Sequence, residues 1–122
     1  MSLTYSRKLA PPGDEPYARV RWTSSVTSYT QVTPGSTPTG GDPFPAVLFG
    51  VQEIVSIQFA GTVSGNFEVI PVRVSGASWI LMWRALNSNT VGGEAQTTGT
   101  EAAAGTNLTG ESVYLVVTTR TA

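Results

Sequence analysis

The chain has 122 residues, which fits one domain, and a formal net charge of −1 with only 12% charged residues. The absence of Cys and His excludes disulfides and thiolate chemistry and removes the commonest general base and metal ligand. Seven basic residues against eight acidic ones disfavour nucleic acid as the main partner, since phosphate binding needs clustered Lys and Arg.

The sequence is poor in charged residues and rich in hydroxyl side chains, with 12 Ser and 17 Thr. Thr favours strands and Ser favours turns, so this composition indicates many short strands joined by polar loops. No apolar run approaches the roughly 18–20 residues of a membrane span, and the first residues are too polar for a secretory signal. We therefore expect no membrane partner and a protein that is made and used without crossing a membrane.

Residues 1–16 are predicted to form an N-terminal arm that precedes a single β domain over residues 17–122. Three prolines within six residues exclude a regular helix in the arm. One interpretation is a frayed terminus. The other is that Leu3, Tyr5 and Leu9, all at odd positions, form a strand that adds to a neighbouring subunit.

Residues 17–29 are predicted to be the first strand of the domain. One set of alternate positions is apolar and is expected to face the core: Ala18, Val20, Trp22 and Val26. Arg19 and Arg21 lie on the opposite face. They form either a solvated surface or a site for phosphate or an acidic partner.

A long loop is expected over residues 30–45, where Pro34-Gly35 is a strong turn signal. Loops of this length without periodicity are uncommon in compact domains and tend to be functional or flexible. Phe44 is interpreted either as a lid over the core or as an exposed contact. The next strand is predicted over residues 51–60, with one apolar face formed by Val51, Val55, Ile57 and Phe59.

Three further strands are predicted. In 67–74, Ile70, Val72 and Val74 share one face, and Pro71 places the strand at an edge or a bulge. The segment 79–86 is apolar on both faces, and its Trp79 and Trp83 are expected in the core or at an interface. The segment 112–119 is also apolar on both faces and is expected inside a sheet.

Residues 87–111 are expected to be mostly loop, with a short strand around Glu94 and either loop or one helical turn at 101–104. The predicted fold is therefore all-β, a small antiparallel β-sandwich or barrel with an extended N-terminal arm and long loops.

The sequence nominates no catalytic, metal-binding or cofactor-binding residues. The carboxylates are scattered, and neither Gly-Gly pair has the Lys or the strand-to-helix context of a phosphate loop. We therefore expect a protein that is not an enzyme and needs no cofactor. One alternative is a carbohydrate-binding β-sandwich module, which would need exposed Trp or Tyr rings. Trp22 and Trp79, however, lie on apolar faces or in apolar runs.

Two loop sequences, together with the order of the strands, carry a resemblance. Thr39-Gly-Gly-Asp-Pro-Phe44 precedes a strand, and Glu101-Ala-Ala-Ala-Gly-Thr-Asn-Leu-Thr109 precedes the last strand. The chain also opens with Met-Ser-Leu-Thr-Tyr-Ser-Arg. It resembles small virion structural proteins of tailed bacteriophages that are encoded near the major capsid protein. One departure is the middle of the chain, where 67–74 and a Trp-rich strand replace a plainer aromatic-Gly hairpin.

The resemblance implies a capsid decoration, or cement, protein that binds the outer shell surface and stabilises the head. Its implied partners are the major capsid protein and further copies of itself, as a homo-oligomer such as a trimer. It would be made in the host cytoplasm and lie on the capsid exterior. The alternative role within a virion is that of a tail or head–tail structural component. The predicted contacts are the arm residues together with Gly41, Asp42, Pro43 and Phe44.

Overall fold

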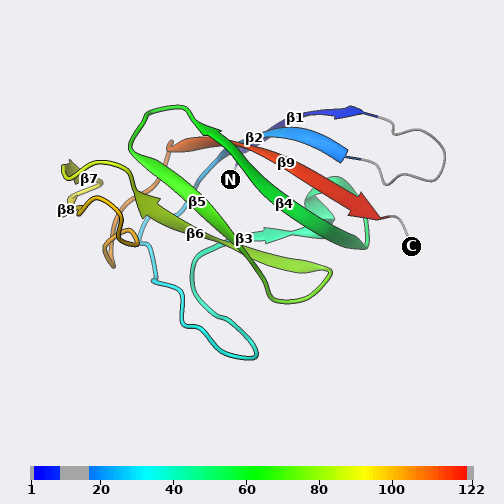
Figure 1. The fold of residues 1–122 in the computed structure, drawn as a ribbon, viewed down its shortest axis with the longest axis horizontal. Helices are drawn as coiled ribbons and strands as arrows, with labels where there is room; N and C mark the ends of the chain where they lie inside the picture. Colours follow the sequence, from blue (N-terminus) through cyan, green and yellow to red (C-terminus); the bar gives the residue numbers. More distant parts are fainter. Residues whose placement is uncertain (1, 9–16, 121–122) are drawn as a thin grey trace.

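The computed structural model describes residues 17–120 in full and the backbone of residues 2–8. Within these ranges nearly all regular secondary structure is β-strand, as the sequence predicts, and loops join the strands (Figure 1). The elements are β1 (Ser2–Lys8), β2 (Tyr17–Thr23), β3 (Asp42–Pro45), the 3₁₀ helix η1 (Ala46–Phe49), β4 (Glu53–Thr62), β5 (Phe67–Arg73), β6 (Ser78–Ala85), β7 (Thr90–Val91), β8 (Glu94–Ala95) and β9 (Ser112–Arg120). No helix in these ranges has the length and hydropathy needed to cross a bilayer.

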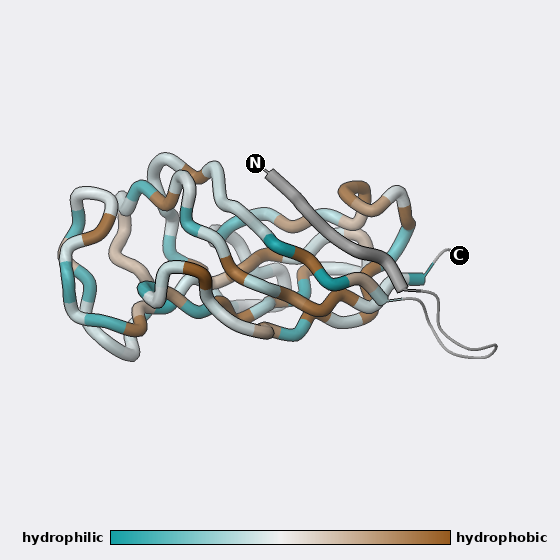
Figure 2. The backbone as a smooth tube through the Cα atoms, turned by 90° about the horizontal axis from the view of Figure 1, so that it is seen from above, coloured by the Kyte–Doolittle hydropathy of each residue, from teal (hydrophilic) through white to brown (hydrophobic). Residues whose placement is uncertain are grey.

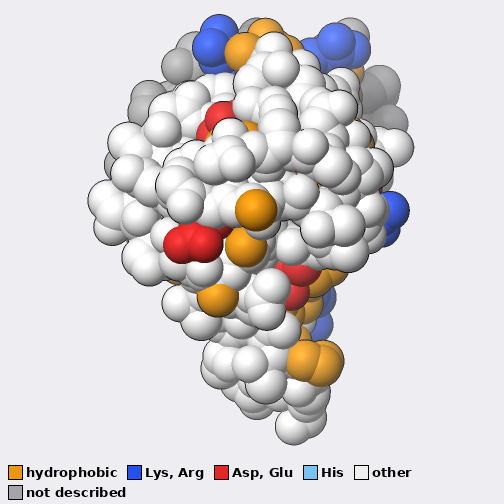
Figure 3. Space-filling model, turned by 90° about the vertical axis from the view of Figure 1, so that its left-hand side faces the viewer, with side chains coloured by type: hydrophobic (Ala, Val, Ile, Leu, Met, Phe, Trp, Pro, Cys, Tyr) orange, Lys and Arg blue, Asp and Glu red, His pale blue; other side chains and the backbone are white. Residues whose placement is uncertain are grey.

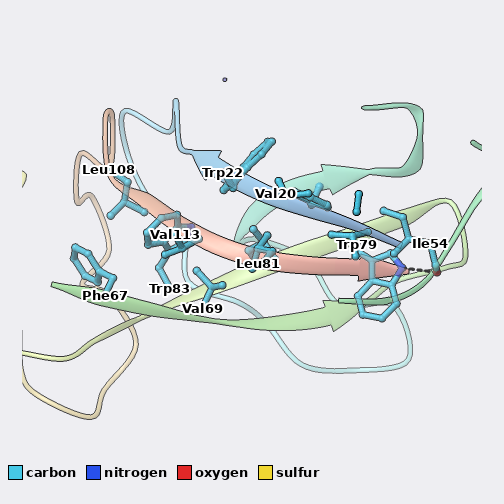
Figure 4. Close-up of a cluster of buried hydrophobic side chains, with 14 of the residues drawn as sticks. Val20, Trp22, Ile54, Phe67, Val69, Trp79, Leu81, Trp83, Leu108 and Val113 are labelled. Carbon is cyan, nitrogen blue, oxygen red and sulfur yellow. Dashed lines mark hydrogen bonds between the residues drawn. The ribbon is translucent and has the colours of Figure 1, made fainter. Parts of the chain in front are cut away.

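Two antiparallel sheets form a small sandwich. The larger sheet has the order β1-β2-β9-β4, and the smaller has the order β3-β6-β5. Side chains from both sheets meet between the two layers in one continuous hydrophobic core (Figure 4). A third pair, β7 and β8, forms a short hairpin outside both sheets, which confirms the strand predicted around Glu94.

The inner face of β2 follows the alternation that the sequence predicts, and hydrophobic and hydrophilic residues alternate along parts of the backbone (Figure 2). On β2 the buried residues are Ala18, Val20 and Trp22. The last strand, β9, lies between β2 and β4, which confirms its interior position. In β6, Trp79 and Trp83 are both buried in the core.

The strand predicted over 51–60 keeps most of its expected face, since Val51 is buried and Ile57 and Phe59 pack against the core, but it differs at Val55. A β-bulge shifts the register between Ile54 and Ser56, so an extra residue, Val55, lies between them. Ile54 is consequently the fully buried residue, and Ile57 stays in phase with it opposite Val117. Simple alternation missed this change because a bulge interrupts the period of two.

The edge position of β5 is confirmed, and Pro71 is tolerated there because an edge strand pairs on one side only. The residues that β5 buries in the core are Phe67 and Val69. Ile70 and Val72, on the face predicted from the sequence, are only half-buried. The β5–β6 hairpin settles the strand pairing in the middle of the chain.

The first predicted strand ends earlier than expected, at Thr23 rather than at Tyr29. The Ser24 hydroxyl accepts a hydrogen bond from the backbone N–H of Val26, which turns the chain. The interpretation of residues 101–104 as a helical turn is also wrong. Glu101 instead forms an isolated β-bridge with Arg84, and the segment continues as loop.

The strand predicted in the N-terminal arm is present as β1, which pairs with β2 of the same chain. In this register Leu3 lies opposite Trp22 and Tyr5 lies opposite Val20. Leu9 lies outside the described residues. The addition of β1 to a neighbouring subunit, and the contact role of Leu3 and Tyr5, stay predictions. Because β1 is the outermost strand of the larger sheet, this segment extends the domain.

Candidate functional site

The connection between β2 and β3 carries the most prominent exposed feature of the molecule. Its tip, Thr33–Thr39, is exposed except for the half-buried Pro38; we call it the presented loop. It extends away from both sheets in Figure 1 (cyan) and forms the tapered end at the bottom of Figure 3. Reciprocal backbone hydrogen bonds between Thr33 and Thr39, with N···O distances of 2.9 and 3.2 Å, close the loop at its neck.

Below this neck the chain is fastened by short polar contacts. The N–H of Gly41 donates to the carbonyl of Thr30 at 2.8 Å, and the Gln31 side-chain amide donates to the carbonyl of Ala102 at 3.1 Å. Gly40 adopts φ 84°, and a Cβ there would lie 2.3 Å from the Gln31 carbonyl oxygen. Gly40 is therefore required by this close backbone approach, and a Cβ at Gly41, where φ is 68°, would lie 3.0 Å from the Leu81 carbonyl oxygen.

Asp42 lies directly after the Gly-Gly pair and joins the two sheets. Its Oδ2 accepts hydrogen bonds from the indole Nε1–H of Trp22 at 3.0 Å and of Trp83 at 3.1 Å. Trp22 belongs to β2 in the larger sheet, and Trp83 belongs to β6 in the smaller one. A carboxyl group that is only 2% exposed requires such partners, because an unpaired buried polar group is costly.

The same environment changes the titration of Asp42. Burial raises the pKa of this carboxyl above its usual value, because the charged form loses its hydration. Hydrogen bonds from Trp22, Ser24 and Trp83 lower the pKa, but burial is the larger effect. Asp42 consequently takes up a proton more readily in the folded protein than in the unfolded chain.

Tyr29 and Glu101 form a second polar contact beside Asp42. The Tyr29 hydroxyl donates to Glu101 Oε2 at 2.8 Å and accepts from the backbone N–H of Trp83 at 3.1 Å. The same Glu101 oxygen accepts from the N–H of Val32 at 2.7 Å. Burial, followed by the hydrogen bond to Glu101, raises the pKa of Tyr29, so its hydroxyl stays protonated and can donate.

Trp83 is the residue on which these contacts converge. Its indole N–H binds Asp42, its backbone N–H binds Tyr29, and its carbonyl accepts the N–H of Ala102 at 2.8 Å. Tyr29, Asp42, Trp83 and Glu101 together form what we call the loop base. Both loop sequences that carry the resemblance reach this base, one through Asp42 and the other through Glu101.

The predicted contact residues of the loop, 41–44, divide into two buried residues and two that are more accessible. Asp42 and Phe44 cannot make outward contacts, since they are 2% and 0% exposed. Asp42 is occupied by the two indoles, and Phe44 packs edge-on against Trp22 with ring centroids 4.8 Å apart. The core interpretation of Phe44 is thus confirmed. Pro43 is exposed and Gly41 is half-buried, and their role as contacts stays a prediction.

Sequence reasoning missed Tyr29 and Glu101 as parts of the site and did not single out the presented loop as its exposed tip. The available signal for the tip was the pair Pro34-Gly35, followed by Pro38, in a long polar loop. No local pattern distinguishes Glu101, because its partner Tyr29 is 72 positions away in the sequence.

Glu101→Ala is expected to destabilise the fold by about 2–3 kcal/mol, because the Tyr29 hydroxyl and the Val32 N–H lose their shared acceptor. Urea denaturation measures the loss, and hydrogen exchange should show faster exchange at Val32. Glu94→Ala is the matched control, since Glu94 is also half-buried but its carboxylate has no hydrogen bond or ion pair with the described residues. Equal losses for the two variants would contradict the role assigned to Glu101.

The polar groups of the loop base form hydrogen bonds with other groups of the protein. Across residues 17–120, no group of three or more His, Cys, Asp or Glu side chains is placed to hold a metal ion. No protein-family model, curated protein or solved structure matches this chain.

Proposed function

We propose that this chain is a virion structural protein that decorates the outer surface of a bacteriophage capsid and contacts it through the presented loop. The observation that carries the proposal is the convergence on Trp83 of the two loop sequences that resemble phage virion proteins. The motifs of the resemblance are the parts that hold the exposed loop in place. The major capsid protein is the proposed partner, and the chain acts without catalysis as a homo-oligomer on the shell.

The construction of the loop supports a role in contact. Pro34 and Pro38 restrict the backbone, and the loop base fixes both ends, so little conformational entropy is lost when the loop meets a surface. The tip, Thr-Pro-Gly-Ser-Thr-Pro-Thr, carries no charged residue. Its binding should rest on hydroxyl hydrogen bonds and proline contacts, and should change little with salt.

The same features suit a tail or head–tail component, which would use the loop against a different virion protein. The carbohydrate-binding alternative has less support. Trp22, Trp79 and Trp83 are all buried, so none of the three rings is placed to stack on a sugar from solvent. Tyr114, at 42%, is the one exposed aromatic ring among the described residues, so a platform of several rings is lacking there.

Binding to capsids isolated without this protein tests the proposal. We expect the purified protein to bind the shell and the double variant Ser36→Arg/Thr37→Arg to bind at least tenfold more weakly, since two bulky charges then occupy the tip. Gln52→Arg is the control, because Gln52 is exposed on a separate loop before β4 and should leave binding within twofold.

Cryo-EM of virions should show density for this chain on the shell exterior, with the presented loop toward the shell. Recovery of the protein only in tail or host-lysis fractions would overturn the proposal. So would unchanged capsid binding by the double variant.

A further inference from the structure

The outward side of the larger sheet forms a second distinctive surface, far from the presented loop. Its members are Arg19 and Arg21 on β2, Tyr114 and Val116 on β9, and Gln58 on β4; we call this set the outer face. In the strand register Arg21 lies opposite Tyr114, while Val116 lies between Arg19 and Gln58. The five side chains are therefore cross-strand or same-strand neighbours. Basic side chains with hydrophobic atoms between them lie at the top of Figure 3, opposite the tapered loop.

The two arginines of the outer face, which are both exposed, have no ion-pair partner among the described residues. By contrast, Arg84 pairs with Glu68 at 3.4 Å. Two adjacent guanidinium groups without an ion pair to the described residues are a local concentration of positive charge in a protein of net charge −1.

The spacing of this charge matches an extended peptide. Arg19 and Arg21 are two positions apart on one strand, so their attachment points are about 6.6–6.8 Å apart. Carboxylates at alternate positions of an extended segment have the same repeat, and guanidinium groups bind carboxylates in a bidentate manner. Two phosphate contacts alone would give nucleic acid little affinity at physiological salt.

An apolar contact lies next to the charge. Tyr114 is 42% exposed, and the residue opposite it on β4 is Gly61. A side chain at Gly61 would begin 3.8 Å from Cδ2 of the Tyr114 ring, so the glycine leaves this flank of the ring uncovered. Tyr and Arg are among the side chains enriched at the hot spots of protein interfaces.

We propose that the outer face binds an extended acidic protein segment whose alternate carboxylates pair with Arg19 and Arg21 while a neighbouring apolar side chain packs on Tyr114. This binding does not depend on the presented loop or on a role at a capsid. It differs from the loop contact in chemistry, because it is charged and weakens as salt screens it.

A ten-residue peptide with Glu at every second position and Ser between tests the proposal. Wild-type protein is expected to bind it at low ionic strength and at least tenfold more weakly at 0.5 M NaCl. Arg19→Gln/Arg21→Gln should weaken binding at least tenfold. Arg73→Gln is the matched control, because Arg73 is exposed on β5 of the other sheet and should leave binding within twofold.

Reversing the charge of both arginines tests whether binding depends on charge complementarity. The Arg19→Glu/Arg21→Glu variant should lose the Glu peptide and gain binding to the same peptide with Lys in place of Glu. All these substitutions are on exposed positions, and an unchanged thermal midpoint verifies folding. The Ser36→Arg/Thr37→Arg variant should bind the Glu peptide as wild type does, which separates this test from that of the proposed function.

The proposal is overturned if wild-type protein does not bind the Glu peptide, or if Arg73→Gln weakens binding as much as the double variant does. Tighter binding of a ten-nucleotide single-stranded DNA than of the Glu peptide, with the same dependence on Arg19 and Arg21, would instead identify a nucleic-acid surface.

Discussion

Asp42→Ala is expected to destabilise the protein by about 2–6 kcal/mol in urea denaturation at pH 7. The substitution removes the shared acceptor of two indole N–H groups, on Trp22 and Trp83, which are both fully buried. Each buried donor left without a partner costs about 1–3 kcal/mol. The loss is large because one carboxyl oxygen serves both sheets.

Asp42→Asn separates the hydrogen bonds from the charge, since Asn keeps a carbonyl oxygen for the indoles and does not titrate. The pKa of Asp42 is raised in the folded state, so the folded protein holds this proton more tightly than the unfolded chain does. The contribution of Asp42 to stability is therefore greatest below its unfolded pKa of about 3.9 and is lost as pH rises through the folded value. The stability of the wild type relative to Asp42→Asn should fall as pH rises from 3 to 7.

Free energies of unfolding for both proteins across this pH range give the sign directly. A difference that grows with pH would mean that the two indoles stabilise the charged carboxylate by more than burial disfavours it. That result would contradict a raised pKa of Asp42 in the folded protein.

The strands were predictable from the sequence because their signal is local. The alternation around Val20 and Trp22 identifies the buried face of β2, and the apolar run of 112–119 identifies an interior strand. Both patterns depend only on the period of two in a strand. Where a bulge adds Val55, the same reasoning assigns the wrong residue to the core, because the bulge depends on pairing with β9.

The loop base was not predictable, because its partners are distant in sequence. Asp42 bonds to indoles 20 and 41 positions away. The sequence prediction placed Asp42 at an interface because its loop carries the resemblance, and nothing local in the sequence marks its carboxyl as buried. Only the packing of the two sheets brings Trp22 and Trp83 together and makes the carboxyl a buried acceptor.

The two proposed surfaces differ in a way that follows from their construction. The presented loop is uncharged and held by buried hydrogen bonds, so mutations in the loop base should act on it through rigidity. The outer face is charged and built on regular strands, so it should respond to salt and to charge substitution. Substitutions of the loop base should consequently leave peptide binding by Arg19 and Arg21 intact in any variant that still folds.

Trp83→Ala is expected to destabilise the protein by about 3–5 kcal/mol, as the loss of a large, fully buried aromatic side chain does. The Trp83 ring packs edge-on against Phe67 with centroids 5.8 Å apart, and its indole N–H binds Asp42. The substitution opens a cavity in the core and removes one of the two donors that hold the carboxyl. Urea denaturation measures the total loss.

Trp79→Ala is the control that isolates the loop base from the general cost of losing a Trp. Trp79 is on the same strand, is 8% exposed, and donates its indole N–H to the carbonyl of Ile54 instead of to the loop base. Both variants should lose stability, but Trp83→Ala alone should accelerate hydrogen exchange at Val32 and Gly41 beyond the change in global unfolding. Equal exchange at these two amides in both variants would show that Trp83 supports the core without holding the presented loop.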